Sequence, residues 1–393
     1  MHLVGRVVGR EGLWELAVQA GRIQGLRPLP PAVVDEDLPW IAPAFVDLQV
    51  NGFGGHDFNG PSLTPEQVEG AVRAVWTTGT GLLLATLITA PFERLAGAAS
   101  TIARVMERGD PAVAATLAGI HLEGPYISPE DGPRGAHPRE YVRPPDWDEF
   151  LRLQDAAGGH IRLVTLAPEM PGALPFIEKA VESGVAVAIG HTAASSSEIA
   201  AAVAAGATLS THLGNGCHAW MRRHPNCIWD QLAADELWAT LIADGWHLPP
   251  AVLKSFVRAK GAGRCILISD AVSLAGMPPG RYRILEAEVQ LTAQGKVMLE
   301  GTDYLAGSVL RLNDAVANVQ RFCGVSLAEA VAMVTSNPAQ ALGLTHRTGH
   351  LRVGMEGNLT VFRIGRDGRV AIEKTVVRGQ EVYRSPSAGS SGG

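Results

Sequence analysis

The chain has few cysteines, no long apolar run and no cluster of basic residues. Four of its 393 residues are cysteine (Cys217, Cys227, Cys265 and Cys323), none in a C-x-x-C pair. Such low usage suits a reducing compartment, so we expect no disulfide and a cytoplasmic location. No apolar run reaches 18 residues, and the N-terminus lacks the basic and apolar regions of a signal peptide, so we expect no membrane span.

The charge balance excludes a further class of partner. The formal net charge is −6, the sequence pI is about 6.1, and no run of Lys or Arg occurs. A nucleic-acid-binding surface needs a basic patch, so we expect no nucleic-acid partner.

Eight short, β-rich apolar runs alternate with stretches that have helical character. These runs cover residues 45–52, 81–89, 117–125, 161–169, 185–193, 207–215, 237–245 and 264–271. Near-continuous hydrophobic strands that alternate with helices are typical of a parallel sheet covered on both faces. Eight such units predict an α/β fold with a (β/α)8 TIM-like barrel, which we place at residues 43–345.

The two ends of the chain have a different pattern. Residues 1–42 and 346–384 carry short alternating runs interrupted by glycine, which predict a small β-sandwich domain formed from both termini. A hairpin-like insert is expected at 281–299 and helices at 308–322 and 326–344. The Ser/Gly-rich segment 385–393 is predicted to be a disordered tail.

Helix signals between the strands are specific in two places. In the helix expected at 62–79, Thr64 is the predicted N-cap, Pro65 follows at the first helical position, and Gly79 ends the helix. In the helix expected at 195–206, Ser195 and Glu198 have the spacing of a capping box.

Four chemically capable residues follow the predicted strands. Glu123 lies at the end of the third predicted strand, and His191, His212 and Asp270 lie at the ends of the fifth, sixth and eighth. Because the carboxyl ends of barrel strands form one ring around one pocket, these residues should converge.

Two imidazoles and one carboxylate form a common open Zn²⁺ ligand set, so Glu123, His191 and His212 are the predicted metal ligands. A bound metal lowers the pKa of its water towards roughly 7. Asp270 is then placed to take a proton from the water and deliver it to a leaving amine. The pattern predicts metal-assisted hydrolysis, most naturally of an amide.

Each of these residues alone also has an ordinary structural explanation. A carboxylate such as Glu123 can pair with an arginine, Asp270 can cap the next helix, and a histidine can be a satisfied core residue. It is their joint placement at four strand ends that favours the metal site. For His121, which shares the strand of Glu123, we favour the structural interpretation of a packing histidine.

The first predicted strand, "FVDLQVNG", carries Gln49 and Asn51 where many barrel hydrolases have a His-x-His pair for a second metal. Amides are poor zinc ligands. We therefore expect one divalent metal ion, most naturally Zn²⁺, although Fe²⁺, Co²⁺ and Mn²⁺ accept the same ligand set.

Taken together, the motifs resemble those of the N-acetylglucosamine-6-phosphate deacetylases of the amidohydrolase superfamily. The resemblance covers about residues 20–384 and depends on "PAFVDLQVNGFGG", "HLEGPYISPEDGPRGAHP", "GHTAAS", "THLGN", "IADGWH", "ISDA" and "LAGS". It implies a cytosolic enzyme that removes acetate from N-acetylglucosamine 6-phosphate, usually as a homodimer.

The resemblance also implies roles for individual residues. Glu123, His191 and His212 match the metal ligands, and Asp270 matches the catalytic acid and base. His137, in "GAH", matches a histidine that binds the sugar and polarises the scissile carbonyl. The residues that match the surroundings of the sugar and its phosphate are Asn215, Gly216, His247, Ala306 and Gly307.

One segment departs from the family pattern. Relatives continue the sixth-strand motif with an aromatic residue and Asn-Ala-Met, whereas this chain has Leu213-Gly214-Asn215-Gly216-Cys217. In relatives an arginine of this region reaches the phosphate, often from the partner subunit. Arg223 is the first candidate and Arg222 the second, against the alternative that both are solvated loop charges.

Deacylation is thus better supported than specificity for the 6-phosphate. One alternative is a deacylase of another N-acyl substrate, such as an unphosphorylated amino sugar or an N-acyl amino acid. An alternative of another class is an inactive barrel that acts as a binding protein. A cyclic-amide hydrolase or a nucleobase deaminase is disfavoured by the missing His-x-His pair and by the "GAH" element.

Overall fold

The computed structural model describes residues 1–30, 38–284, 287–299 and 305–386. Within these ranges an eight-stranded sheet has the order β5-β8-β9-β10-β11-β12-β13-β14, and every pair of neighbours is parallel. The eight strands are β5 (Phe45–Val50), β8 (Thr80–Ile88), β9 (Leu117–Glu123), β10 (Ile161–Leu166), β11 (Ala186–Ile189), β12 (Leu209–Ser210), β13 (Trp238–Leu241) and β14 (Cys265–Leu267).

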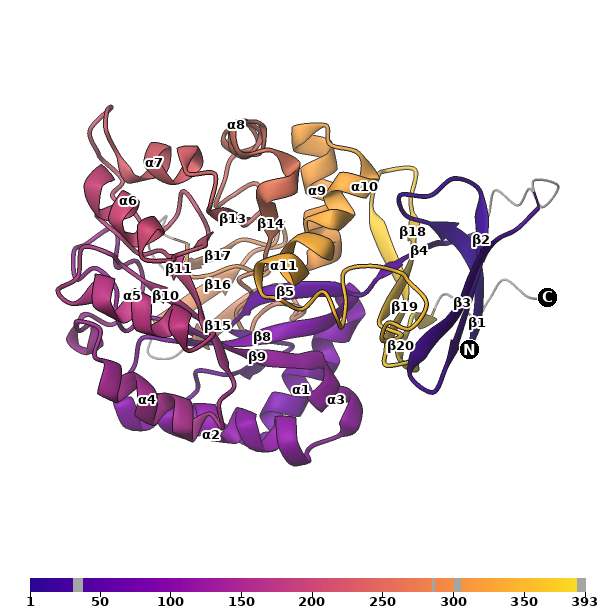
Figure 1. Cartoon of the computed structure of the whole chain (residues 1–393), viewed down its shortest axis with the longest axis horizontal. Helices are drawn as coiled ribbons and strands as arrows, with labels where there is room; N and C mark the ends of the chain where they lie inside the picture. The colour runs from indigo at the N-terminus through magenta and orange to yellow at the C-terminus, as the bar shows by residue number, and fades with distance from the viewer. Residues whose placement is uncertain (31–37, 285–286, 300–304, 387–393) are drawn as a thin grey trace.

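The sheet closes on itself between its first strand and the segment after its last. Val50 forms a parallel bridge with Ala271, and the Asn51 amide donates to the Ala271 carbonyl at 2.8 Å. Helices surround the strands in Figure 1. The predicted (β/α)8 barrel is confirmed, with its strands in chain order.

The helices lie between the strands and after the last one. They are α1 (Pro65–Val75), η1 (Trp76–Thr78), α2 (Phe92–Arg108), α3 (Pro111–Thr116), η2 (Arg139–Tyr141), α4 (Trp147–Ala156), α5 (Ala173–Glu182), α6 (Ser196–Ala204), α7 (Cys227–Ala233), α8 (Pro250–Lys260), η3 (Ala262–Arg264), α9 (Leu312–Cys323), α10 (Leu327–Ala332) and α11 (Ser336–Ala341).

The helix signals in the sequence act as predicted. Thr64 caps α1 in a capping box with Gln67, and Ser195 caps α6 in a capping box with Glu198. Gly79 ends the first helical segment in the left-handed conformation, with φ of 84°. The single helix expected at 326–344 is instead two short helices, α10 and α11.

The barrel strands are buried on both faces. Every residue of β5 and of β9 is buried, including Glu123 at the end of β9. Each fully buried Val, Leu or Ile side chain contributes about 1.5–3 kcal/mol to folding. This large apolar core offsets the cost of burying a few polar side chains at the carboxyl end of the barrel.

Both termini build the second part of the molecule, at the right of Figure 1. In the described chain it is a seven-stranded sheet of order β20-β19-β18-β4-β1-β2-β3. The sheet curls, because the backbone of Ile23 bonds to Gly354 and Met355, just before β18. Its two halves therefore share an apolar core that includes Leu16 and Leu359. The strands are β1 (His2–Val7), β2 (Leu13–Gln19), β3 (Arg22–Pro28), β4 (Trp40–Pro43), β18 (Leu359–Ile364), β19 (Val370–Val377) and β20 (Gln380–Arg384).

The predicted β-domain from both termini is thus confirmed, while its boundaries at 42/43 and 345/346 stay a prediction. The insert expected at 281–299 forms an antiparallel sheet of β15 (Gly280–Ile284), β16 (Ala287–Leu291) and β17 (Val297–Leu299). A small pair, β6 (Gly52–Phe53) and β7 (His56–Asp57), follows β5. Residues 387–393 of the predicted disordered tail lie outside the described residues. No helix in the described part of the chain is both long and apolar enough to cross a membrane.

Candidate active site

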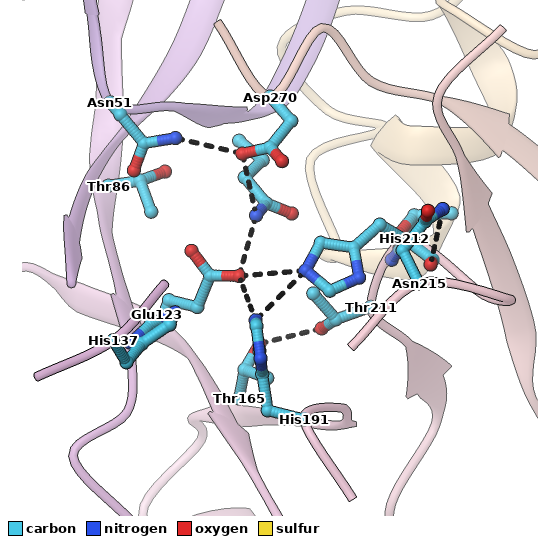
Figure 2. A network of polar contacts seen from close by, with 12 residues as sticks. Asn51, Thr86, Glu123, His137, Thr165, His191, Thr211, His212, Asn215 and Asp270 are labelled. Carbon is cyan, nitrogen blue, oxygen red and sulfur yellow. Dashed lines mark hydrogen bonds and ion pairs between the residues drawn. The ribbon is translucent and has the colours of Figure 1, made fainter. Parts of the chain in front are cut away.

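Three strand-end side chains meet at the carboxyl end of the barrel (Figure 2). Glu123 ends β9, and His191 and His212 each lie two residues beyond β11 and β12. Their Nε2 atoms are 3.2 and 3.0 Å from Glu123 Oε1, and 3.1 Å from each other. All three side chains are buried. The structure therefore brings together the three residues that the sequence predicts as metal ligands.

The geometry of this cluster fits a divalent cation. In the part of the chain that the structure describes, these three residues form a group of possible metal ligands. One ligand atom from each lies within 4.8 Å of the other two. Ligand atoms about 2.0–2.1 Å from a tetrahedral ion lie about 3.3–3.4 Å apart, close to the separations here. The Nδ1 of His191 is 2.9 Å from the Pro133 carbonyl, which requires a proton on Nδ1 and leaves the Nε2 lone pair for a metal.

The backbone at this end of the barrel is strained. His191, His212 and Asp270 have φ of 50°, 29° and 48°, in the left-handed region that side chains with a Cβ seldom adopt. Each such residue costs about 1–3 kcal/mol and persists only where its surroundings hold it. In this conformation the side chains of His191 and His212 reach Glu123.

The charges of the cluster shift the pKa values of its members. Burial would raise the pKa of Glu123, but hydrogen bonds with His191 and His212 and their positive charge hold it well below its ordinary value. Burial would lower the pKa of His212, but the contact with Glu123 raises it overall. Glu123 is therefore an anion that favours a positive charge between the two rings.

Asp270 lies beside the cluster, three residues beyond β14. Burial, followed by the negative charge of Glu123, raises the pKa of Asp270 to about 6. A carboxyl group with a pKa near neutrality suits both acceptance and donation of a proton.

The amide pair of the first strand contacts these carboxylates directly. Gln49 Nε2 donates to Glu123 Oε1 at 2.8 Å and to Asp270 Oδ1 at 3.0 Å. Asn51 Nδ2 donates to Asp270 Oδ1 at 2.8 Å (Figure 2). Gln49 and Asn51 thus present N–H donors to these two carboxylates, and the single metal stays a prediction.

His137 lies next to the metal ligands. Its ring centroid is 4.3 Å from that of His191, and its Nδ1 is 2.8 Å from Thr89 Oγ1. Burial, and then the nearby charge of His191, lower the pKa of His137 to about 3, so the ring is neutral.

Two other histidines have clear partners. His247 Nδ1 is 2.6 Å from Asp244 Oδ2. The ring nitrogens of His121 lie 3.1 Å from the Leu48 carbonyl and 2.7 Å from Thr165 Oγ1. His121 is thus bonded inside the barrel, as its interpretation as a packing histidine requires.

Of the predicted substrate-binding residues, Asn215 and Gly216 adjoin the cluster. Asn215 Nδ2 donates to the His212 carbonyl at 3.3 Å (Figure 2). Gly216 has φ of 59°, and a Cβ built there would lie 3.0 Å from His191 Nδ1 and 3.2 Å from His212 Cε1. The absence of a side chain at Gly216 therefore leaves room for the two imidazole rings.

The remaining predicted residues have contacts other than with the metal ligands. The Ala306 amide bonds to the Val297 carbonyl of β17, and Gly307, with φ of 90°, packs against Val272. The Arg223 side chain is exposed, and its carbonyl accepts a hydrogen bond from Asn226 Nδ2 at 3.3 Å.

Sequence reasoning missed two polar residues that support the site. Glu169, after β10, accepts hydrogen bonds from Thr192 Oγ1 at 2.5 Å and from the Ala193 amide at 2.7 Å, and so holds the loop after His191. Asp47, within β5, accepts from the Ser269 amide at 3.2 Å. Asp47 could have been found, because a carboxylate inside the apolar run "FVDLQV" needs a partner.

Comparison with known proteins agrees with this geometry. The model of the Amidohydrolase family matches residues 40–382. N-acetylgalactosamine-6-phosphate deacetylase from Escherichia coli O157:H7 is 33% identical over 366 residues, which cover 93% of this chain and 94% of that protein. N-acetylglucosamine-6-phosphate deacetylase from Bacillus subtilis (strain 168) is 32% identical over 350 residues, which cover 88% and 86% of the two chains.

Solved structures of the same kind superpose over nearly the whole chain. N-acetyl-D-glucosamine-6-phosphate deacetylase from Mycobacterium smegmatis aligns with a TM-score of 0.86 and 32% identity, covering 98% of this chain and 100% of that one. A mutant of the M. smegmatis enzyme, solved in complex with N-acetyl-D-glucosamine-6-phosphate, aligns with a TM-score of 0.85 and 32% identity over 97% and 99% of the two chains. On the match over residues 40–382 and these similarities, the chain belongs to the amidohydrolase family.

Proposed function

We propose that this chain hydrolyses the N-acetyl group of N-acetylglucosamine 6-phosphate, giving glucosamine 6-phosphate and acetate. The observation that carries the proposal is the Glu123–His191–His212 cluster with Asp270 beside it, at the carboxyl end of a barrel. Relatives 32–33% identical over most of the chain, whose names describe deacetylases of N-acetylhexosamine 6-phosphates, support it.

Amidohydrolases are metal-dependent, and the three ligands suit one divalent ion, which we propose to be Zn²⁺, with Fe²⁺, Co²⁺ or Mn²⁺ as substitutes. When bound, such an ion polarises the amide carbonyl and activates water. Asp270 accepts the proton of the attacking water and then donates it to the amine that leaves. The neutral His137 ring, held by Thr89, donates a hydrogen bond to the scissile carbonyl.

Recognition of the sugar phosphate falls to the loops around the cluster. We assign contacts with the sugar and its phosphate to Asn215, Gly216, His247, Ala306 and Gly307, and the charged contact with the phosphate to Arg223. Because Arg223 is exposed in the single chain, its contribution fits a homodimer in which it serves the partner subunit. The free thiols of all four cysteines support a cytoplasmic location.

The similarity to the E. coli O157:H7 protein supports a second candidate substrate, N-acetylgalactosamine 6-phosphate. The two sugars differ only in the configuration at C4, a carbon that bears neither the amide nor the phosphate. Because the amide is the same in both sugars, the catalytic cluster does not distinguish them. The preference for one sugar therefore depends on the loops that contact the sugar ring.

The test is acetate release by zinc-loaded enzyme from N-acetylglucosamine 6-phosphate, N-acetylgalactosamine 6-phosphate and unphosphorylated N-acetylglucosamine at equal concentration. We expect a strong preference for phosphorylated sugar, because binding energy at the phosphate lowers the barrier at the amide. Equal rates with and without phosphate, or no acetate from any of the three, would overturn the proposal.

The phosphate assignment has a matched pair of variants on one loop. Arg223→Ala should raise KM for the phosphorylated sugar about tenfold or more, since an arginine–phosphate contact is charge-assisted. Arg222→Ala should change it little. If only Arg222→Ala raises KM, the phosphate contact belongs to Arg222. If neither variant changes KM, this loop does not bind the phosphate.

A further inference from the structure

Asp270 is held by hydrogen bonds to one of its two carboxylate oxygens. Gln49 Nε2 and Asn51 Nδ2 both donate to Oδ1, at 3.0 and 2.8 Å. In the described part of the chain, no hydrogen bond to Oδ2 occurs. The two oxygens of this carboxylate are therefore distinct: Oδ1 is held by Gln49 and Asn51, and Oδ2 is available.

The backbone on both sides of Asp270 is tied to the same strand. The Ser269 amide donates to Asp47 Oδ1 at 3.2 Å, and the Ala271 carbonyl accepts from the Asn51 amide at 2.8 Å. Asp270 between them has φ of 48°, a conformation that must be imposed by its surroundings. Strand β5 and Asn51, which follows it, thus hold both the backbone and the side chain of Asp270.

Gln49 has an additional role in spacing. Its NH₂ group has two hydrogens, and it donates one to Glu123 Oε1 and one to Asp270 Oδ1. Two carboxylates that share a buried site repel each other. A neutral amide between them offsets this repulsion and fixes the distance between the predicted metal ligand and the predicted proton carrier.

We infer that Gln49 and Asn51 are positioning residues, which hold Asp270 Oδ1 so that Oδ2 is the oxygen that exchanges protons with the reacting water and amine. This inference rests on the proposed function. The two amides donate hydrogen bonds to a negative carboxylate, and such charge-assisted bonds are strong and directional. In this role they act through Asp270.

The test uses Asn51→Leu and Gln49→Met, which keep side-chain size and remove the donors. The matched control is Asn337→Leu. Asn337 is as buried as Asn51, with 6% against 8% exposed, and its Nδ2 donates to the carbonyls of Ala262 and Cys265, before and at the start of β14.

We expect Asn51→Leu to lower kcat about 10- to 100-fold, the loss typical of a misplaced catalytic group, with KM within about threefold of wild type and one metal per chain. Asn337→Leu should lower the thermal midpoint and leave kcat per folded molecule unchanged. The inference is overturned if Asn51→Leu keeps kcat within about twofold, or if its activity falls only in proportion to folded protein or bound metal.

A crystal structure of the Gln49→Met/Asn51→Leu double variant gives a readout that does not need activity. The inference expects the Asp270 carboxylate to rotate away from its wild-type position, and an unmoved carboxylate overturns it. If wild-type enzyme releases no acetate from any of the three sugars, the proposed function fails. The crystal structure of the double variant then still tests whether Gln49 and Asn51 position the Asp270 carboxylate.

Discussion

Glu123 Oε1 and His212 Nε2 lie 3.0 Å apart although 89 residues separate them in the chain. The barrel makes this contact possible, because the carboxyl ends of β9 and β12 meet at the same rim. A buried carboxylate requires a positive partner, which a metal ion held by Glu123 and the two imidazoles would supply. The contact places two of the three proposed metal ligands side by side.

Replacement of Glu123 by Gln should abolish tight metal binding. The substitution removes the negative charge that favours a cation between His191 and His212, and we expect metal affinity to fall about a hundredfold or more. Metal content after dialysis measures this. Glu149→Gln is the control, because Glu149 pairs with Arg143 instead; the account fails if both variants retain metal equally.

Asp270→Asn should separate metal binding from hydrolysis. The amide keeps the shape of the side chain but cannot carry the proton, so we expect metal content to remain and acetate release to fall about 10²- to 10⁴-fold. Parallel measurement of metal content and kcat decides the point. Hydrolysis at the wild-type rate would show that another group moves the proton.

Gly216→Ala should damage the metal site without removing a ligand. At φ of 59° the new Cβ would lie 3.0 Å from His191 Nδ1, closer than side chains normally pack. We expect weaker metal binding and lower kcat, measured by titration of metal-free protein with Zn²⁺. Gly159→Ala, at a φ of 79° with no atom within 4 Å of the added Cβ, is the control for backbone strain alone. Equal metal affinity in the two variants would contradict this.

Much of the fold and the core of the site could be predicted from the sequence. The eight apolar runs indicate parallel strands, and parallel strands end at one rim, so Glu123, His191, His212 and Asp270 could be placed together without coordinates. The caps at Thr64 and Ser195 could be predicted because their hydrogen bonds are local.

Other features depend on contacts that no local pattern records. The bonds from Gln49 and Asn51 to Asp270 require the barrel to close, with β5 beside residues 269–271. The split between α10 and α11 follows from Pro338, whose ring would clash with the Val334 carbonyl in a continuous helix. The chain instead starts a new helix at Ser336, with Pro338 in its first turn.

The Asp47 carboxyl should give stability a measurable pH dependence. Burial raises its pKa from 3.8 to about 7, against the hydrogen bonds from Ser269 and Gln49 that lower it. Between about pH 4 and 7 the folded state therefore holds a proton that the unfolded state releases. The contribution of Asp47 to the free energy of unfolding falls as pH rises through this window, by up to about 1.4 kcal/mol per pH unit.

Asp47→Asn keeps the Oδ1 acceptor and removes the titration. The free energy of unfolding of wild type should fall relative to that of the variant between pH 4 and pH 7, as measured by denaturant unfolding at several pH values. A constant difference between the two proteins across this range would refute the raised pKa.

The most direct test of the whole account is a titration of metal-free enzyme with Zn²⁺, followed by acetate release from N-acetylglucosamine 6-phosphate. The account predicts that activity rises with added zinc and reaches its plateau at one equivalent per chain, set by Glu123, His191 and His212. Activity that is independent of zinc, or a plateau only at two equivalents, would contradict a single metal site beside the Gln49 and Asn51 amides.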